Sequence, residues 1–267
     1  MYKNLKTGFW VLLLVLVLST SIAFAKKPKY TEVEVVDGGS LKGTVQFKGQ
    51  VPPPVSVNLK NEKNSEFCME NTPNSRGEHL IQHVEIKDGN LKDAVVFIQN
   101  IEKGKPRSKE TLAIRFENCQ AFPKVAVIRK PPKNITRNLV TLENFDAGVL
   151  HNPKGFSIRG DTRKIFFKKW LLNKGARTDV TKSLRFVKKE RDSHFYIECE
   201  QHLWMTVSSK IVWNPYHDIS KGDGSFEIDQ IPPGHYKVVV WHPYIGEKTT
   251  EIDISSGGDT QLELTLP

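Results

Sequence analysis

The chain has 267 residues, of which 38% are hydrophobic and 26% charged, with 18 glycines and 15 prolines; this fits globular domains and excludes a collagen-like or wholly disordered chain. The formal net charge of +9 comes from basic clusters separated by acidic residues. We therefore expect either an ordinary, solvated basic surface or one whose positive potential attracts an acidic partner. We expect no nucleic-acid binding.

Residues 1–25 have the features of a secretory signal peptide. Lys3 and Lys6 precede an apolar run over 9–18, and Ala23-Phe24-Ala25 fits an A-x-A cleavage site. An uncleaved anchor is the alternative, but the run is short for a membrane span, which needs about 20 residues. We expect cleavage after residue 25, no stable membrane span in the mature protein, and a periplasmic or secreted location.

The mature chain has the pattern of an all-β protein. Short runs rich in β-branched and aromatic residues alternate with turns rich in Gly, Pro, Asn and Asp, as in sandwiches and barrels. The predicted strands cover residues 41–47, 55–59, 84–86, 94–99, 112–116, 125–129, 139–143, 156–158, 195–199, 207–213, 225–228, 236–242, 249–254 and 261–266. The basic segment 159–194 is ambiguous, and an apolar cluster in Lys164–Asn173 fits a short helix.

The two ends of the mature chain share one sequence pattern. Gly38–Gly49 is a Gly-punctuated strand pattern followed by Pro52-Pro53-Pro54, and residues 213–267 contain similar Gly- and Pro-bounded strand runs. We therefore expect residues 30–65 to supply the first strands of a small sandwich that residues 214–267 complete. A larger domain, residues 84–213, would be inserted between them.

The strongest chemical signal is Cys199-Glu-Gln-His202-Leu-Trp-Met205. It places a thiolate, an imidazole and a thioether on one short loop between two predicted strands. Mononuclear copper sites use Cys and His as strong ligands and Met as a weak axial ligand. Zinc is the second candidate metal, but Met is a poor zinc ligand.

A second imidazole has to come from elsewhere in the chain, and His151 is the best candidate. It follows the predicted strand 139–143 and an Asn144-Phe-Asp146 turn, which puts it on a loop at one end of a sheet. Asn152 beside it is a candidate for hydrogen bonds that hold the two ligand loops together.

The C-x-x-H-x-x-M loop, with an upstream His-Asn after an N-x-D turn, resembles the cupredoxins, in particular the amicyanin and plastocyanin group. The resemblance covers residues 84–213 and implies a Greek-key β-sandwich with one type 1 copper per chain. Its ligands would be His151, Cys199, His202 and Met205. Leu203 and Trp204, beside His202, would form the docking patch for a redox partner.

Residues 224–241, Gly-Ser-Phe-Glu-Ile-Asp-Gln-Ile-Pro-Pro-Gly-His-Tyr-Lys-Val-Val-Val-Trp, resemble a carboxypeptidase-regulatory-like, or transthyretin-like, β-sandwich. The combination is similar to exported bacterial proteins described as methylamine-utilisation-like. These share the G-x-V-x-F-x-G strand seen here at Gly43–Gly49. The fold class implied is all-β, a cupredoxin-like sandwich plus a small transthyretin-like sandwich.

The cysteine count agrees with a Cys199 ligand. No C-x-x-C pair is present, which excludes a zinc ribbon, a thioredoxin-type redox pair and attached c-type haem. If Cys199 binds metal, Cys68 and Cys119 are left to pair in an oxidising compartment. Pairing of Cys199 with either of the others is the alternative, and it would abolish the metal site.

Two functions follow. The first is a non-enzymatic, one-electron copper carrier, whose redox partner would be an acidic c-type cytochrome or a copper enzyme. The second is a carbohydrate- or envelope-binding scaffold, in which the cupredoxin-like domain stores copper or is a relic. Whether Cys199 binds copper discriminates between them.

Overall fold

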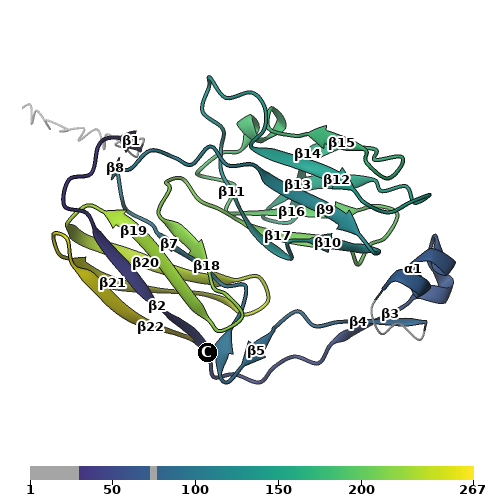
Figure 1. The fold of residues 1–267 in the computed structure, drawn as a ribbon, viewed down its shortest axis with the longest axis horizontal. Helices are drawn as coiled ribbons and strands as arrows, with labels where there is room; N and C mark the ends of the chain where they lie inside the picture. The colour runs from purple at the N-terminus through teal and green to yellow at the C-terminus, as the bar shows by residue number, and fades with distance from the viewer. Residues whose placement is uncertain (1–29, 73–76) are drawn as a thin grey trace, which may run out of the picture.

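The structure is a computed structural model that describes residues 30–72 and 77–267. It consists of two β-sandwiches and one excursion, residues 55–81, which lies beside the sandwich formed by residues 112–211 (Figure 1). The all-β prediction is therefore confirmed. The expected signal peptide, residues 1–25, lies outside the described residues. Within the described part of the chain, no helix has the length and apolar character needed to cross a membrane.

The first body, which we call the central sandwich, is built from two mixed sheets. In one sheet the order is β10, β9, β12, β15, and in the other β11, β17, β16, β13, β14. The strands are β9 (Leu112–Glu117), β10 (Gln120–Phe122), β11 (Val125–Ile128), β12 (Val140–Asn144), β13 (Pro153–Arg159), β14 (Thr162–Lys168), β15 (Arg177–Asp179), β16 (His194–Cys199) and β17 (Thr206–Ile211).

Alternation along β16 places one of its side chains in the core at every second position. Phe195, Ile197 and Cys199 are fully buried, while the residues between them are partly exposed. A period of two is what a strand with one core-facing side requires. Cys199 is the last inward position of this strand, so the strand itself delivers the thiol to the end of the core.

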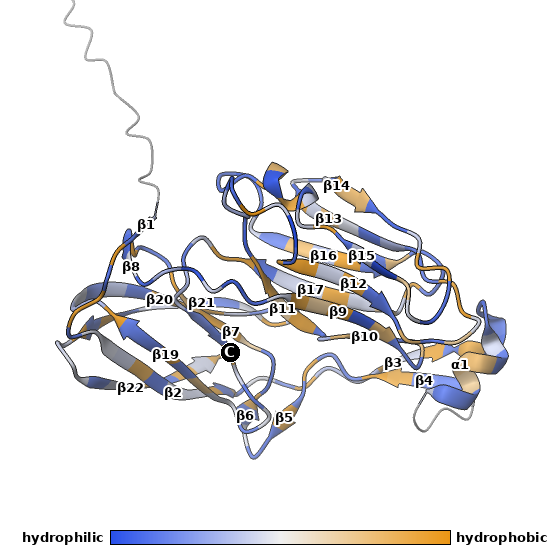
Figure 2. Cartoon of the chain, turned by 45° about the horizontal axis from the view of Figure 1, so that its top comes forward, coloured by the Kyte–Doolittle hydropathy of each residue, from blue (hydrophilic) through white to orange (hydrophobic). Residues whose placement is uncertain are grey.

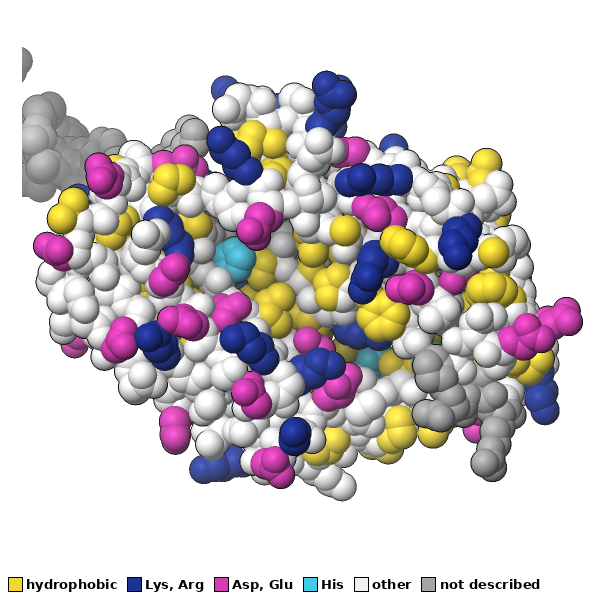
Figure 3. All heavy atoms as spheres, in the orientation of Figure 1, with side chains coloured by type: hydrophobic (Ala, Val, Ile, Leu, Met, Phe, Trp, Pro, Cys, Tyr) yellow, Lys and Arg dark blue, Asp and Glu magenta, His cyan; other side chains and the backbone are white. Residues whose placement is uncertain are grey.

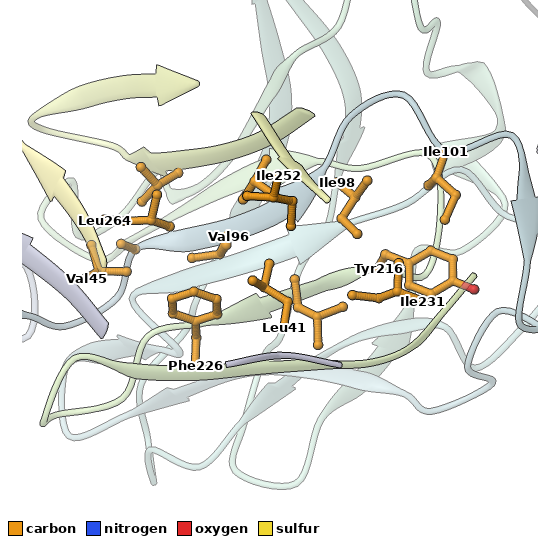
Figure 4. Packing of buried hydrophobic residues seen from close by; sticks show 14 of the residues in the cluster. Leu41, Val45, Val96, Ile98, Ile101, Tyr216, Phe226, Ile231, Ile252 and Leu264 are labelled. Atoms are coloured by element: carbon orange, nitrogen blue, oxygen red, sulfur yellow. The ribbon is translucent and has the colours of Figure 1, made fainter. Parts of the chain in front are cut away.

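The second body, the split sandwich, takes its strands from both ends of the chain and from residues 86–98. Its strands are β2 (Gly39–Phe47), β5 (Ile86–Lys87), β6 (Asn90–Leu91), β7 (Val95–Ile98), β18 (His217–Ile219), β19 (Ser225–Ile231), β20 (Gly234–His242), β21 (Gly246–Ile254) and β22 (Asp259–Leu266). Strand β2 pairs in parallel with β22 and antiparallel with β19. Side chains such as Leu41, Val96 and Phe226 fill the space between its sheets (Figure 4).

The structure corrects the expected boundary at residue 84. Strand β7 pairs with β18 and β20, and β6 pairs with β2, so residues 86–98 belong to the split sandwich. Of residues 30–65, it is β2 that joins this body, whereas β1 (Thr31–Glu32) pairs with β8 (Lys103–Gly104). Residue patterns alone do not reveal which sheet a short strand such as β7 joins.

An apolar cluster joins the two sandwiches. Val95 and Phe97 of β7 and Val239 and Trp241 of β20 pack against Val125 and Val212 of the central sandwich. Both strands therefore bury side chains on two sides, one side toward the split-sandwich core and the other toward this interface. This is why β7 and the second half of β20, residues 238–241, are apolar without interruption.

Residues 55–81 form the excursion. It contains β3 (Val55–Asn58), the 3-10 helix η1 (Leu59–Asn61), α1 (Ser65–Asn71) and β4 (Glu78–Ile81), with β3 and β4 paired antiparallel. It carries both hydrophobic and hydrophilic residues (Figure 2). A small apolar cluster around Leu59 and Cys68 packs it against Cys119 and Trp204 of the central sandwich.

The short helix that fitted Lys164–Asn173 is wrong. Residues 162–168 are β14, a strand paired antiparallel with β13 after a turn at Gly160. Beyond it the chain stays extended, and Leu171 forms an isolated bridge with His151. The helix in segment 159–194 is instead the short 3-10 helix η2 (Ser183–Phe186).

Candidate metal centre

Strand pairing brings two distant loops to the same end of the central sandwich. Pro153, at the start of β13, is the partner of Cys199 at the end of β16. His151, two residues before, is held by two backbone hydrogen bonds with Leu171, 3.1 and 2.8 Å long. The upstream histidine therefore lies beside the thiol, as the sequence predicts.

His151, Cys199 and His202 form one compact donor cluster. The Nδ1 atoms of His151 and His202 lie 3.8 and 3.7 Å from the Sγ of Cys199. All three donor atoms lie within 4.8 Å of one another, and none of the three residues is exposed. This is a candidate metal site in which two imidazole nitrogens and one thiolate converge.

Backbone hydrogen bonds close the loop from Cys199 to Met205. The Cys199 N–H donates to the Met205 carbonyl over 3.1 Å, the His202 N–H to the Cys199 carbonyl over 3.3 Å, and the Met205 N–H to the His202 carbonyl over 2.9 Å. Met205 is fully buried in the same hydrophobic cluster as Cys199. The loop therefore holds the predicted thioether in the hydrophobic core that also contains Cys199.

Asn152 joins the two ligand loops, as predicted. Its backbone N–H donates to the Cys199 Sγ over 3.4 Å, and its side-chain Nδ2 donates to Glu200 over 3.0 Å. Its Oδ1 is buried without a hydrogen-bond partner among the described residues. The N–H donated to sulfur stabilises the thiolate form of Cys199.

Asp146 is a functional candidate to which the sequence argument gave no role. Its Oδ2 lies 3.0 Å from the Nε2 of His151, and both side chains are buried. A carboxylate only accepts hydrogen bonds, so His151 donates from Nε2 and presents Nδ1 to Cys199. The ring also stacks on Phe116, with centroids 5.3 Å apart.

Asn144 fixes the loop that carries Asp146 and His151. Its Nδ2 donates to the carbonyls of Val149 and Leu171 over 2.8 and 2.9 Å, and its Oδ1 accepts the Asp146 N–H over 2.8 Å. The last bond is an Asx turn, which the Asn-x-Asp spacing permits. That spacing is the sequence signal that points to Asp146.

The surroundings favour a thiolate at Cys199. Burial by itself raises the pKa of this thiol, but hydrogen bonds from His151, His202 and the Asn152 N–H outweigh it and lower the pKa to about 6. Burial also disfavours charge on His151, yet its bonds to Asp146 and Cys199 raise its pKa. Metal ligands have to be deprotonated, so metal binding at these side chains would be coupled to the release of protons.

The structure contains the Cys68–Cys119 disulfide, with Cα atoms 5.4 Å apart, and Cys199 is a free, buried cysteine. The alternative pairings that would abolish the metal site are therefore excluded.

The expected docking patch needs a correction at Trp204. Leu203 is 66% exposed, but Trp204 is half-buried beneath the excursion, and its Nε1 donates to the Cys119 carbonyl over 2.9 Å. His202 itself is fully buried. Trp204 thus packs against the excursion, while Leu203 faces outward.

Residues 216–262, part of the split sandwich, match the family model fn3_3, described as polysaccharide lyase family 4, domain II. No curated protein sequence matches the chain. Among solved structures, a Cu-containing nitrite reductase from Thermus scotoductus SA-01 is similar, at 18% identity and a TM-score of 0.28. The match covers 40% of this chain and 24% of that chain. A likeness this low supports no functional conclusion.

Proposed function

We propose that this chain binds one copper ion and acts in one-electron transfer. The observation that carries the proposal is the buried cluster of His151, Cys199 and His202, whose donor atoms lie within 4.8 Å of one another. Two imidazoles and a thiolate are the strong ligands of mononuclear copper electron-transfer sites.

The donor set fits copper better than zinc. Structural zinc sites take four Cys, His or carboxylate ligands, whereas here the fourth candidate donor is the thioether of Met205. A weak thioether ligand is typical of copper sites. Copper bound by these four side chains would supply a one-electron couple.

The surrounding residues keep the donors in place and dry. Backbone bonds across residues 199–205 and from Leu171 to His151 restrict how far the ligands move. The Asn152 N–H stabilises negative charge on Cys199. Fixed ligand positions keep reorganisation small when the charge of the site changes. All three donors are buried, which limits the access of a substrate and favours electron transfer over substrate turnover. We therefore propose a carrier rather than an enzyme.

A redox partner would dock at the exposed end of the central sandwich, next to the cluster. Leu203, 66% exposed, follows His202, and Phe145, 38% exposed, precedes Asp146. The net charge of +9, which becomes +7 when Lys3 and Lys6 leave with residues 1–25, suits an acidic c-type cytochrome or copper enzyme. Lys, Arg, Asp and Glu side chains are interspersed over the face in Figure 3. We therefore attribute the attraction of an acidic partner to the net charge of the protein.

We propose a periplasmic or secreted location. The Cys68–Cys119 disulfide is typical of oxidising compartments. The pattern of residues 1–25 is that of an export signal.

The carbohydrate- or envelope-binding scaffold is not favoured. The family-model match at residues 216–262 concerns the split sandwich alone. A scaffold whose cupredoxin-like domain is a relic gives no role to a buried thiol beside two imidazoles, and copper storage does not require donors held this rigidly.

Cycling between oxidation states tests the proposal. The mature protein, loaded with Cu(II), is reduced and reoxidised repeatedly by small one-electron reagents while copper content is followed. The proposal expects one electron per chain in each cycle with copper retained. Copper that is released on reduction, or tight zinc binding with no copper uptake, contradicts it. His202→Ala, which removes one donor, serves as the comparison.

A further inference from the structure

The turn between β9 and β10 connects the excursion to the metal centre. Asn118 and Cys119 form this turn with φ values of 53° and 55°. Left-handed backbone is common for Asn but not for Cys, so the surroundings have to hold Cys119 there. One restraint is the disulfide to Cys68 of α1.

The second restraint is Asp146. Its Oδ1 accepts the Asn118 N–H over 2.6 Å, and its Oδ2 accepts the Cys119 N–H over 3.1 Å. The same Oδ2 accepts the Nε2–H of His151 over 3.0 Å. One buried carboxylate therefore ties the strained turn to a metal-ligand imidazole.

The carbonyl of Cys119 is connected to the other imidazole, His202, through Trp204. It accepts the Nε1–H of Trp204, and the indole packs edge-on against His202 with ring centroids 5.2 Å apart. Trp204 also contacts the apolar cluster of the excursion, which includes Leu59 and Cys68. The Nε2 of His202 is buried without a hydrogen-bond partner in the described part of the chain, so packing alone orients this ring from that side.

A further contact ties the excursion to the ligand loop. Lys63, just before α1, donates from Nζ to the Oε1 of Gln201 over 2.7 Å. Gln201 lies between Cys199 and His202. The excursion therefore contacts the ligand loop at two residues, Trp204 and Gln201.

We propose that Cys119, fixed by its disulfide to Cys68, positions both histidines of the metal centre: His151 through Asp146 and His202 through Trp204. This inference rests on the proposed metal site. The excursion is then a structural part of the centre, and Asp146 and Trp204 are positioning residues. Without the disulfide, α1 is released and the left-handed turn relaxes, so both imidazoles lose a support at once.

The first test compares the wild type with Cys68→Ser/Cys119→Ser and with Asp146→Ala. Copper affinity is measured by competition with a chelator, and the absorption and EPR spectra of the bound copper are recorded. Loss of groups that orient metal ligands costs about 10- to 100-fold in affinity. We expect a loss of that size with altered spectra in both variants, and a smaller loss in Asp146→Asn, which keeps one acceptor oxygen.

Asp179→Ala is the matched control. Asp179 also accepts two backbone N–H groups, from Asn138 and Thr181, but it lies at the end of β15, beside the start of β12 and away from the cluster. It should leave copper affinity and spectra unchanged. Unchanged affinity and spectra in the disulfide variant overturn the proposal, as does an equal loss in Asp179→Ala.

A metal-free readout separates this inference from the proposed function. NMR of the imidazole protons in the apo wild type should show a slowly exchanging His151 Nε2–H, because Asp146 and burial protect it. The proton should exchange rapidly in both Asp146→Ala and the disulfide variant, or in wild type treated with a thiol reductant if that variant fails to fold. A proton that stays protected without the disulfide overturns the inference, whatever metal the wild type binds. Failure of the wild type to take up copper contradicts the proposed function instead.

Discussion

Replacing Asn144 with Ala should destabilise the loop that carries His151. The amide makes three buried hydrogen bonds, two donated to the Val149 and Leu171 carbonyls and one accepted from the Asp146 N–H. The substitution leaves the Val149 carbonyl and the Asp146 N–H without this partner, while the Leu171 carbonyl keeps its bond from the His151 N–H. Each unpaired buried group costs about 1–3 kcal/mol, so the free energy of unfolding should fall by about 2–6 kcal/mol.

Urea denaturation of the metal-free protein measures this loss, and Asn173→Ala is its control. Asn173 is exposed on the neighbouring loop, where the same substitution should change the free energy of unfolding by no more than about 0.5 kcal/mol. A loss below about 1 kcal/mol in Asn144→Ala, less than the cost of a single unpaired group, would contradict this expectation. It would mean that water or a loop shift satisfies the two groups.

Two further predictions concern stability away from the cluster. Tyr216 is fully buried, and its hydroxyl accepts the Lys105 N–H and donates to the Gln230 carbonyl, so Tyr216→Phe should cost about 1–3 kcal/mol in urea unfolding; an unchanged midpoint contradicts this. Burial raises the pKa of Asp192, but hydrogen bonds from Arg159, Ser157 and the Lys188 N–H outweigh it and hold the pKa below its ordinary value of 3.8. The stabilisation is therefore present above that value and is lost as pH falls through the lower, folded-state pKa. Thermal unfolding should show a steeper loss in acid for wild type than for Asp192→Asn, and parallel curves would rule this out.

The ligand loop was predictable because its chemistry is local. Cys199, His202 and Met205 lie within seven residues after a strand, and their donor atoms are unusual together. His151 followed from the need for a second imidazole after a strand end. Asp146 needed the structure, because a carboxylate five residues from a histidine is common and only the fold shows it facing the ring.

The excursion and the domain boundary were harder to predict for physical reasons. Helix α1 has seven residues, too few for a periodic pattern, and its disulfide to Cys119 spans 51 positions. Strand β7 is apolar on both sides because it serves a core and an interface, so its sequence does not say which sheet it joins. Strand β14 did not show the alternation of a strand, because the register shift opposite Gly155 and Phe156 leaves Phe166 as an extra residue in the apolar run Ile165–Phe167.

The visible absorption spectrum of the mature protein after addition of Cu(II), recorded beside that of Cys199→Ser, shows whether the Cys199 thiolate binds copper. We expect an intense thiolate-to-copper band that saturates at one copper per chain, disappears on reduction, and is missing in Cys199→Ser. No band, with no copper retained after dialysis, would contradict it.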